Sequence, residues 1–271
     1  MASPSRDKRD IFLSTVRAMK GREKFACLTV YDASLARVLE AAGVEVLLVG
    51  DSLGMVIQGR ESTLAVTLSD MIYHASCVSR VRRRALLMVD MPFMGAATPA
   101  RALGSAERLM REGGAHIVKI EGGRAIAETV RLLAEHGLPV CAHLGLLPQF
   151  VHKLGGYRAQ GRDSDAAATL REDARILEEA GADMLLLESI PSALAGEVTR
   201  SVRIPVIGIG AGPACDGQVL VLYDVIGVSQ RRPRFAHDFL QSETGGVKAA
   251  VEAYVRAVKI GAFPAAEHQF S

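Results

Sequence analysis

The chain has 271 residues, of which 49% are hydrophobic, and a formal net charge of +2 at pH 7. That length suits one α/β domain of roughly 200–250 residues, and the near balance of charge argues against nucleic acid as a partner. No apolar stretch approaches the ~20 residues of a membrane helix, so we expect no membrane partner. The charged start MASPSRDKRDIF is not a secretory signal. Four cysteines without CxxC or CxxH spacing indicate a reducing, cytoplasmic location and no structural zinc.

Strand-like and helix-like segments alternate along the chain. Apolar runs predict strands at 25–31, 44–50, 85–91, 116–120, 139–144, 184–188, 204–209 and 219–226. Amphipathic patterns predict helices at 33–42, 69–83, 99–112, 124–136, 166–180, 191–201 and 246–260. Four helices end at a glycine that we expect to act as a C′ cap, namely Gly43, Gly113, Gly137 and Gly181. The strands are apolar continuously, which is typical of parallel strands covered on both faces.

Eight such strands with helices between them predict a single (β/α)8 TIM barrel over residues 1–271. A doubly wound open sheet is the alternative, because periodicity does not prove closure. The connections 53–68 and 147–165 are unusually long. Both follow the carboxyl end of a strand, where barrels place their active sites, so we expect them to cover a substrate.

Five of the apolar runs end on ionisable residues. These residues are Asp51, Asp90, Lys119 with Glu121, His143 and Glu188. A charge at the end of a buried strand is costly unless it is paired, bound to a metal or facing a wet cleft. Because all five runs carry the charge at the downstream end, parallel strands would deliver these side chains to one shared site.

The three carboxylates Asp51, Asp90 and Glu121 would repel one another unless a cation lay among them. Oxygen ligands favour a hard cation, so we expect Mg2+ first and Mn2+ second. Taken singly, each carboxylate has an ordinary alternative role as a helix cap or as the partner of a lysine or arginine. Asp51 followed by Ser52 is itself a candidate N-cap.

Lys119 and Glu121 flank one residue and would project to the same side of a strand. They form either a structural ion pair or a pair in which Lys119 binds a substrate oxygen while Glu121 serves the metal. His143 is a candidate ligand, acid–base group or hydrogen-bonding partner. Glu188 is a candidate base beside an apolar strand, or the partner of an arginine. The run GIGAG indicates either close approach of the backbone to a ligand or tight packing.

Motifs along nearly the whole chain resemble the ketopantoate hydroxymethyltransferase family: TVYDAS, LLVGDSLGMVIQG, DMPFM, VKIEGG, PVCAHLGLLPQ, LLLESIP and IPVIGIGAG. The resemblance implies a TIM barrel that makes 2-dehydropantoate from 3-methyl-2-oxobutanoate, with 5,10-methylenetetrahydrofolate as co-substrate and Mg2+ as cofactor. It implies a homodecamer. Position by position, it implies metal binding by Asp51, Asp90 and Glu121, substrate binding by Asp51, Ser52, Asp90, Lys119 and His143, and a catalytic base in Glu188.

The chain departs from the family pattern at Leu147 and Ala65 and in the basic stretch 227–235. The arginines of that stretch are either an anion patch or, as we expect, solvated surface. Two other functions stay open. One is a lyase or mutase similar to the isocitrate lyase and phosphoenolpyruvate mutase group, although the KKCGH and DARTD motifs of that group are absent. The other is an inactive scaffold.

Overall fold

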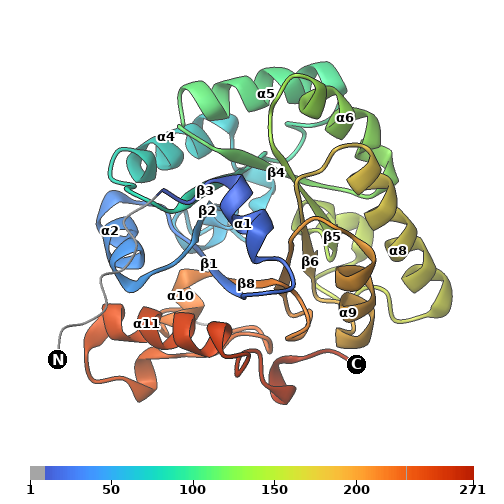
Figure 1. Ribbon diagram of the computed structural model, residues 1–271. Coiled ribbons are helices and arrows are strands. Elements are labelled where there is room, and N and C mark those ends of the chain that lie inside the picture. Colours follow the sequence, from blue (N-terminus) through green and yellow to red (C-terminus); the bar gives the residue numbers. More distant parts are fainter. Residues whose placement is uncertain (1–9, 230) are drawn as a thin grey trace.

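The computed structural model describes residues 10–229 and 231–271 and shows eight parallel strands that close into one barrel (Figure 1). The strands are β1 (Phe25–Thr29), β2 (Val46–Val49), β3 (Leu86–Asp90), β4 (Ile117–Glu121), β5 (Val140–Gly145), β6 (Met184–Glu188), β7 (Val206–Ile209) and β8 (Gly217–Leu220). Each strand pairs with the next along the chain, and β1 pairs with β8 in the register that places Cys27 opposite Val219. The predicted barrel is confirmed, and the open sheet is excluded.

Helices form a layer around the barrel (Figure 1). They are α2 (Ala33–Ala42), α4 (Leu68–Ser79), α5 (Pro99–Arg111), α6 (Ala127–Glu135), α8 (Ser164–Glu179), α9 (Ser192–Ser201) and α11 (Gly246–Lys259). The seven predicted helices are all present, with small shifts at their ends. With helices outside and side chains filling the inside, every residue of β1 to β4 is buried. This double covering explains why the strands are apolar without alternation.

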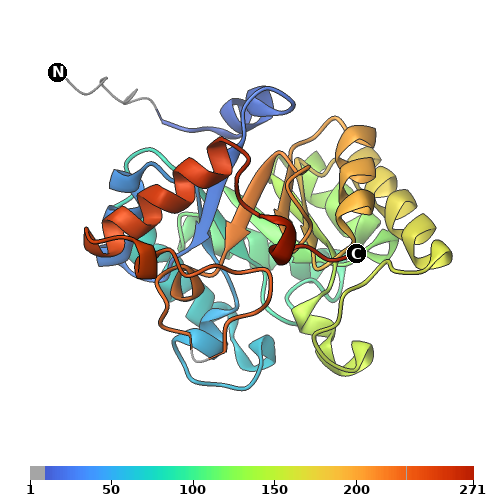
Figure 2. The ribbon, with the colours of Figure 1, turned by 90° about the horizontal axis from the view of Figure 1, so that it is seen from below.

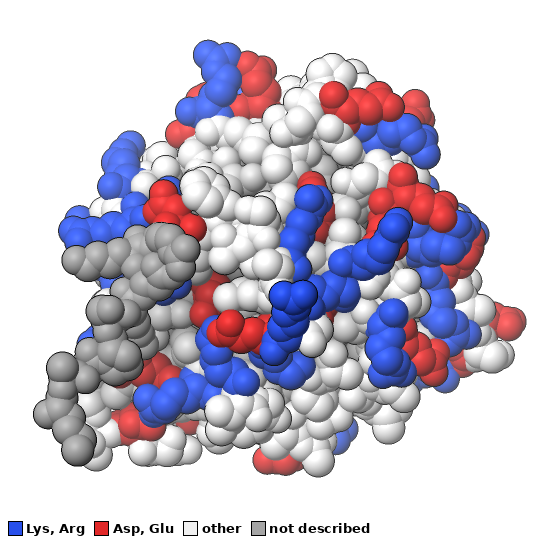
Figure 3. Space-filling model, in the orientation of Figure 1, with Lys and Arg blue, Asp and Glu red and all other residues white. Residues whose placement is uncertain are grey.

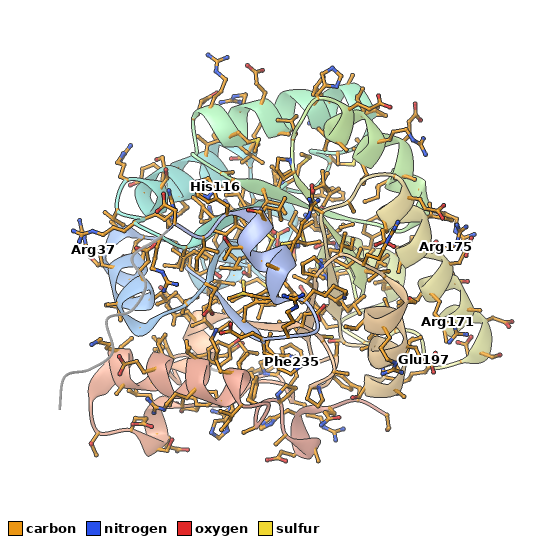
Figure 4. The ribbon with its side chains drawn as sticks, in the orientation of Figure 1. Arg37, His116, Arg171, Arg175, Glu197 and Phe235 are labelled. Carbon is orange, nitrogen blue, oxygen red and sulfur yellow. The ribbon has the colours of Figure 1, made fainter. Side chains whose placement is uncertain are left out.

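Charged side chains occupy the outer faces of the helices. Arg171 of α8 pairs with Glu197 of α9 at 2.8 Å, and Arg175 lies between Glu172 and Glu179 on the same face of α8 (Figure 4). Such exposed pairs contribute little to stability. On the face of the molecule in Figure 3, Lys and Arg are interspersed with Asp and Glu rather than gathered by sign. In the part of the chain that the structure describes, none of the helices combines the length and apolar character needed to cross a membrane.

Two predictions about local structure are wrong. The eighth strand covers Gly217–Leu220 rather than 219–226, because the apolar run continues past the strand into the short helix α10 (Leu222–Val225), which also buries Leu222 and Val225. An apolar run alone does not mark such a change from strand to helix. After α5, the left-handed residue is Gly114, with φ of 76°, and not Gly113. The other three cap glycines do have positive φ.

The two ends of the barrel are built differently (Figure 2). The helix α1 (Leu13–Met19), which the sequence analysis did not predict, lies at one end and buries Val16 completely. The long connections that follow β2 and β5 lie at the other end. They contain the short helices α3 (Leu53–Val56) and α7 (Val151–Leu154), so neither connection is without structure of its own.

Gly217 provides a test of barrel packing. A Cβ atom at Gly217 would lie 2.4 Å from the ring of the fully buried Phe25. We expect Gly217→Ala to lower the free energy of unfolding by about 1–3 kcal/mol, since the ring cannot move without displacing its neighbours. Gly104→Ala is the control, because Gly104 is an exposed position of α5 with no atom near its missing Cβ. That change should stabilise the helix by about 0.5–1 kcal/mol. Urea denaturation measures both, and equal effects would contradict the packing argument.

Candidate active site

A cavity of about 430 Å3 lies at the carboxyl ends of the strands. All seven side chains that the sequence singled out line it: Asp51, Ser52, Asp90, Lys119, Glu121, His143 and Glu188. They come from the ends of β2, β3, β4, β5 and β6, so the shared site expected from the placement of charges exists as one cavity. Met55 and Val56 from the first long connection and Tyr157 from the second also line this cavity.

Asp51 and Asp90 lie side by side and are both buried. The backbone N–H of Asp51 donates to Asp90 Oδ2 at 3.0 Å. Asp51 does not serve as the N-cap of α3, because that helix begins after Ser52 and has no side-chain cap. The Ser52 hydroxyl instead lies 2.8 Å from the hydroxyl of Tyr31. The ordinary capping role considered for Asp51 therefore does not account for its position.

Lys119 is the central cation of the site. Its Nζ lies 3.2 Å from Asp90 Oδ1, 4.0 Å from Glu121 Oε1 and 3.1 Å from His143 Nδ1. The expected ion pair between Lys119 and Glu121 is thus present, but the carboxylate closer to Lys119 is that of Asp90 on β3. Burial alone would lower the pKa of Lys119, yet the surrounding carboxylates of Asp90, Glu121 and Asp51 raise it overall. Lys119 therefore remains charged.

The carboxylates show the opposite effect of burial. Burial, followed by the charges of Asp90 and Glu121, raises the pKa of Asp51 well above its usual range. Burial also raises the pKa of Asp90 and of Glu121, and Lys119 opposes both shifts. One buried lysine faces three buried carboxylates, so the site has an excess of negative charge that a further cation would relieve.

His143 connects Lys119 to Glu188. A charged lysine can only donate, so Nδ1 of His143 accepts from Lys119 and the imidazole proton is assigned to Nε2. Nε2 faces Glu188 Oε2 at 3.3 Å. Burial and the charge of Lys119 lower the pKa of His143, which keeps the imidazole neutral. Among the described residues no arginine pairs with Glu188, so the alternative of an arginine salt bridge is not what the structure shows.

Gln149 is a site residue that the sequence analysis missed. Its side-chain Nε2 donates to Asp51 Oδ2 at 2.8 Å and to the carbonyl of Met91 at 2.9 Å. Its backbone N–H donates to Glu121 Oε2 at 2.9 Å. Three hydrogen bonds thus fix the start of the second long connection against the carboxylates of β2 and β4. The only sequence signal was its place in PVCAHLGLLPQ, directly after a strand that carries a site histidine.

The glycine run after β7 is explained by packing. A Cβ atom at Gly210, whose φ is 58°, would lie 2.8 Å from the ring of Phe235 and 3.0 Å from that of Phe270. At Gly212, with φ of 79°, a Cβ atom would overlap Ser192. Of the two interpretations of GIGAG, the structure supports tight packing at these positions.

The side chains of the site can supply only some of the oxygen ligands that a magnesium ion needs. Among residues 10–229 and 231–271, no three His, Cys, Asp or Glu side chains lie close enough together to hold a metal as they stand. Mg2+ commonly takes one or two carboxylates and completes its shell with waters and substrate oxygens. Asp51 and Asp90 supply such a pair. Asp90 Oδ1 and Glu121 Oε1 are buried without an aligned hydrogen-bond donor, although Lys119 Nζ is near both.

Comparison with known proteins decides the family. The sequence model described as "Ketopantoate hydroxymethyltransferase" matches residues 10–266 of the chain. The chain belongs to the ketopantoate hydroxymethyltransferase family. It is therefore an enzyme, and a transferase. The expected family resemblance is confirmed, and the inactive scaffold loses its support because the candidate residues of the family site are all in one cavity.

Relatives in this family are similar over almost their whole length. A 3-methyl-2-oxobutanoate hydroxymethyltransferase of Nitrosococcus oceani is 57% identical over 257 residues, which cover 94% of this chain and 97% of that protein. One of Nitrosomonas europaea is 56% identical over 265 residues, which cover 97% of this chain and 98% of the relative.

Solved structures of lower identity share the barrel. A phosphoenolpyruvate phosphomutase from Streptomyces platensis matches with a TM-score of 0.61 at 13% identity, covering 80% of this chain and 83% of its own. A 2,3-dimethylmalate lyase matches with a TM-score of 0.57 at 22% identity, covering 76% of this chain and 79% of its own. At this identity the likeness shows the fold alone, so it does not favour the lyase or mutase alternative.

The neutral state of His143 predicts a pH effect on stability. The folded chain takes up a proton at His143 only below the usual histidine pKa of about 6.5, whereas the unfolded chain takes it up near that value. As pH falls through about 6.5, the unfolded state gains the proton first, and the free energy of unfolding should fall. The fall should be smaller in His143→Asn. Urea denaturation at several pH values measures both, and an NMR titration that placed the His143 pKa at or above 6.5 would contradict this assignment.

Proposed function

We propose that the chain transfers a hydroxymethyl group from 5,10-methylenetetrahydrofolate to 3-methyl-2-oxobutanoate, giving 2-dehydropantoate and tetrahydrofolate. The family match supports the reaction. The observation that carries the mechanism is the contact of Glu188 with neutral His143 on the same cavity wall as Lys119, Asp51 and Asp90. The C3–H bond of the oxo acid and the two carbon–nitrogen bonds that hold the one-carbon unit in the folate break, and a C3–carbon bond forms to that unit. Water supplies the hydroxyl group, and the proton from C3 and the second proton of water go to the two folate nitrogens.

Glu188 is the base in this proposal. The proton on C3 lies next to a ketone and is acidic only when the negative charge that forms on the keto oxygen is stabilised. His143 Nε2 lies 3.3 Å from Glu188 Oε2 without an aligned hydrogen bond, so the neutral imidazole lies beside the carboxylate without adding a full positive charge. Leu146, Leu186 and Ile209 line the same cavity and provide an apolar surface for the two methyl groups of C3.

Lys119 and Ser52 bind the oxo acid. The buried ammonium of Lys119 provides the nearest positive charge for the substrate carboxylate or keto oxygen. Asp51 and Asp90 would hold Mg2+, which would supply positive charge to stabilise negative charge that forms on the keto oxygen. Both oxygens of Glu121 face groups of the chain itself: Oε2 accepts from Gln149, and Oε1 faces Lys119 and His143. We therefore propose that Glu121 would add negative charge beside the ion while it holds Gln149 and Lys119 in place.

The family resemblance also implies a homodecamer, and the scattered cysteines favour a cytoplasmic location. Both stay predictions.

Replacement of the base tests the mechanism directly. We expect Glu188→Gln to slow the exchange of the C3 proton of 3-methyl-2-oxobutanoate for deuterium by about 10²–10⁴-fold, since an amide does not accept the proton. NMR follows the exchange with Mg2+ and without the folate. Glu197→Gln is the matched control, because Glu197 lies on the outer surface of α9 and pairs with Arg171. Unchanged exchange in Glu188→Gln would overturn the assignment of the base.

Removal of the proposed ligands tests the metal site. Asp51→Asn and Asp90→Asn should each weaken Mg2+ binding at least about tenfold, measured by titration calorimetry in the presence of the oxo acid, because each loses a charged oxygen ligand. Asp165→Asn, an exposed residue in the first turn of α8, should bind Mg2+ as the unaltered chain does. Wild-type affinity in both site variants would show that the ion is held elsewhere.

A further inference from the structure

The segment that follows α10 contributes to the mouth of the active-site cavity. Ser229, Arg231, Arg232, Pro233 and Phe235 line the cavity together with the site residues. The two arginines are exposed, as expected for a solvated surface, but they also face the space in which substrates bind. The sequence stretch that is more basic than the family pattern thus belongs to the site.

Charge is distributed unevenly within this cavity. Five carboxylates line it: Asp51, Asp90, Glu121 and Glu188 lie at the strand ends, and Asp224 of α10 interacts electrostatically with Arg232. Among the described lining residues the lysine and arginine side chains are Lys119, Arg231 and Arg232. Lys119 is already occupied by the carboxylates around it. In the proposed function Lys119 serves the oxo acid, so an anionic group of the second ligand is attracted to the two arginines instead.

The three arginines of the segment have different neighbours. Arg234 is a structural residue, since its Nε donates to the carbonyl of Glu267 at 3.0 Å and its guanidinium lies over the ring of Phe270. Arg232 Nη1 lies 3.5 Å from Asp238 Oδ2, which neutralises part of its charge. Arg231 makes no hydrogen bond or ion pair with any residue that the structure describes. Its guanidinium has five donors available for a ligand.

The segment is packed against the rest of the molecule. Phe235, labelled in Figure 4, lies edge-on to Phe270 with the ring centroids 6.5 Å apart. Both rings pack against Gly210. The carbonyl of Phe270 accepts from the N–H of Ser192 at the start of α9. Figure 2 shows the C-terminal residues folded back against the barrel. The segment is therefore anchored at Phe235, a few residues after the arginines, which lowers the entropic cost of using them to bind a ligand.

We propose that Arg231, with Arg232 as a second contact, binds the carboxylates of the glutamate tail of the reduced folate. This inference rests on the proposed function. The one-carbon unit of the folate must reach the oxo acid at the floor, so the pterin end enters first. Met55 and Tyr157, whose Sδ and Oη atoms lie 3.8 Å apart, line the cavity from the two long connections and suit its ring system. The carboxylates at the other end of the molecule then remain near the mouth, where the two arginines lie.

The number of glutamates on the co-substrate gives the sharpest test. In the unaltered chain the KM for a triglutamate form of 5,10-methylenetetrahydrofolate should be lower than for the monoglutamate. Arg231→Ala should raise the KM for the monoglutamate about 2- to 5-fold, the range of exposed charge pairs. The double change Arg231→Ala with Arg232→Ala should remove most of the preference for the triglutamate. Arg231→Lys should retain part of it, because the charge remains while the two-pronged geometry is lost.

A control and a second reaction separate the possible outcomes. Arg203→Ala is the matched control, since the Arg203 side chain is 94% exposed and precedes β7 at the opposite end of the barrel. The KM for the oxo acid, measured by C3 exchange without folate, distinguishes the two anionic substrates. A KM for folate that is the same in Arg231→Ala and Arg203→Ala overturns the inference. A rise in the KM for the oxo acid instead assigns the arginines to the other substrate and also overturns it.

Failure of the proposed function would look different. If the unaltered chain exchanged the C3 proton but transferred no one-carbon unit from either folate, the function itself would be wrong, and the inference with it. If transfer occurred and its KM for folate did not depend on the two arginines, only the inference would fall.

Discussion

The active site depends on the burial of one lysine among three carboxylates. Lys119 contacts Asp90 and Glu121 at the ends of adjacent strands, and its charge is stabilised there although burial alone opposes it. The barrel makes this possible because it delivers strand ends to one place and surrounds them with apolar side chains. Loss of one member would destabilise the structure, since an unpaired buried charge costs several kcal/mol.

Lys119 also determines the state of His143. Because the ammonium occupies Nδ1, the histidine presents a proton at Nε2 toward Glu188. The ion pair, the neutral imidazole and the candidate base therefore form one connected arrangement across four neighbouring strands, β3 to β6. Gln149 ties the connection after β5 to the same arrangement through Asp51 and Glu121. A change at any member should be felt by the others, so single substitutions here are not expected to be additive.

Much of the fold and of the floor of the site could be predicted from the sequence, because strand ends in a barrel are marked by a change from apolar to charged residues. Asp51, Asp90 and Glu188 were found in this way, and all three line the cavity. Gln149 could not be found, since its role depends on how a long connection folds back. The end of β8 was missed because Leu222 and Val225 continue the apolar run into a helix. Arg231 belongs to the cavity only through the packing of Phe235 on Phe270, which are far apart in sequence.

The position of Phe270 has a practical consequence. The ring of Phe270 packs edge-on against Phe235, and its carbonyl accepts from the N–H of Ser192 at the start of α9, whereas α1 lies at the far end of the barrel (Figure 2). A small side chain in place of Phe270 would leave a void beside Phe235 and loosen the segment that carries Arg231 and Arg232. A search for substitutions that alter use of the substrates should therefore include Phe270, although it does not line the cavity.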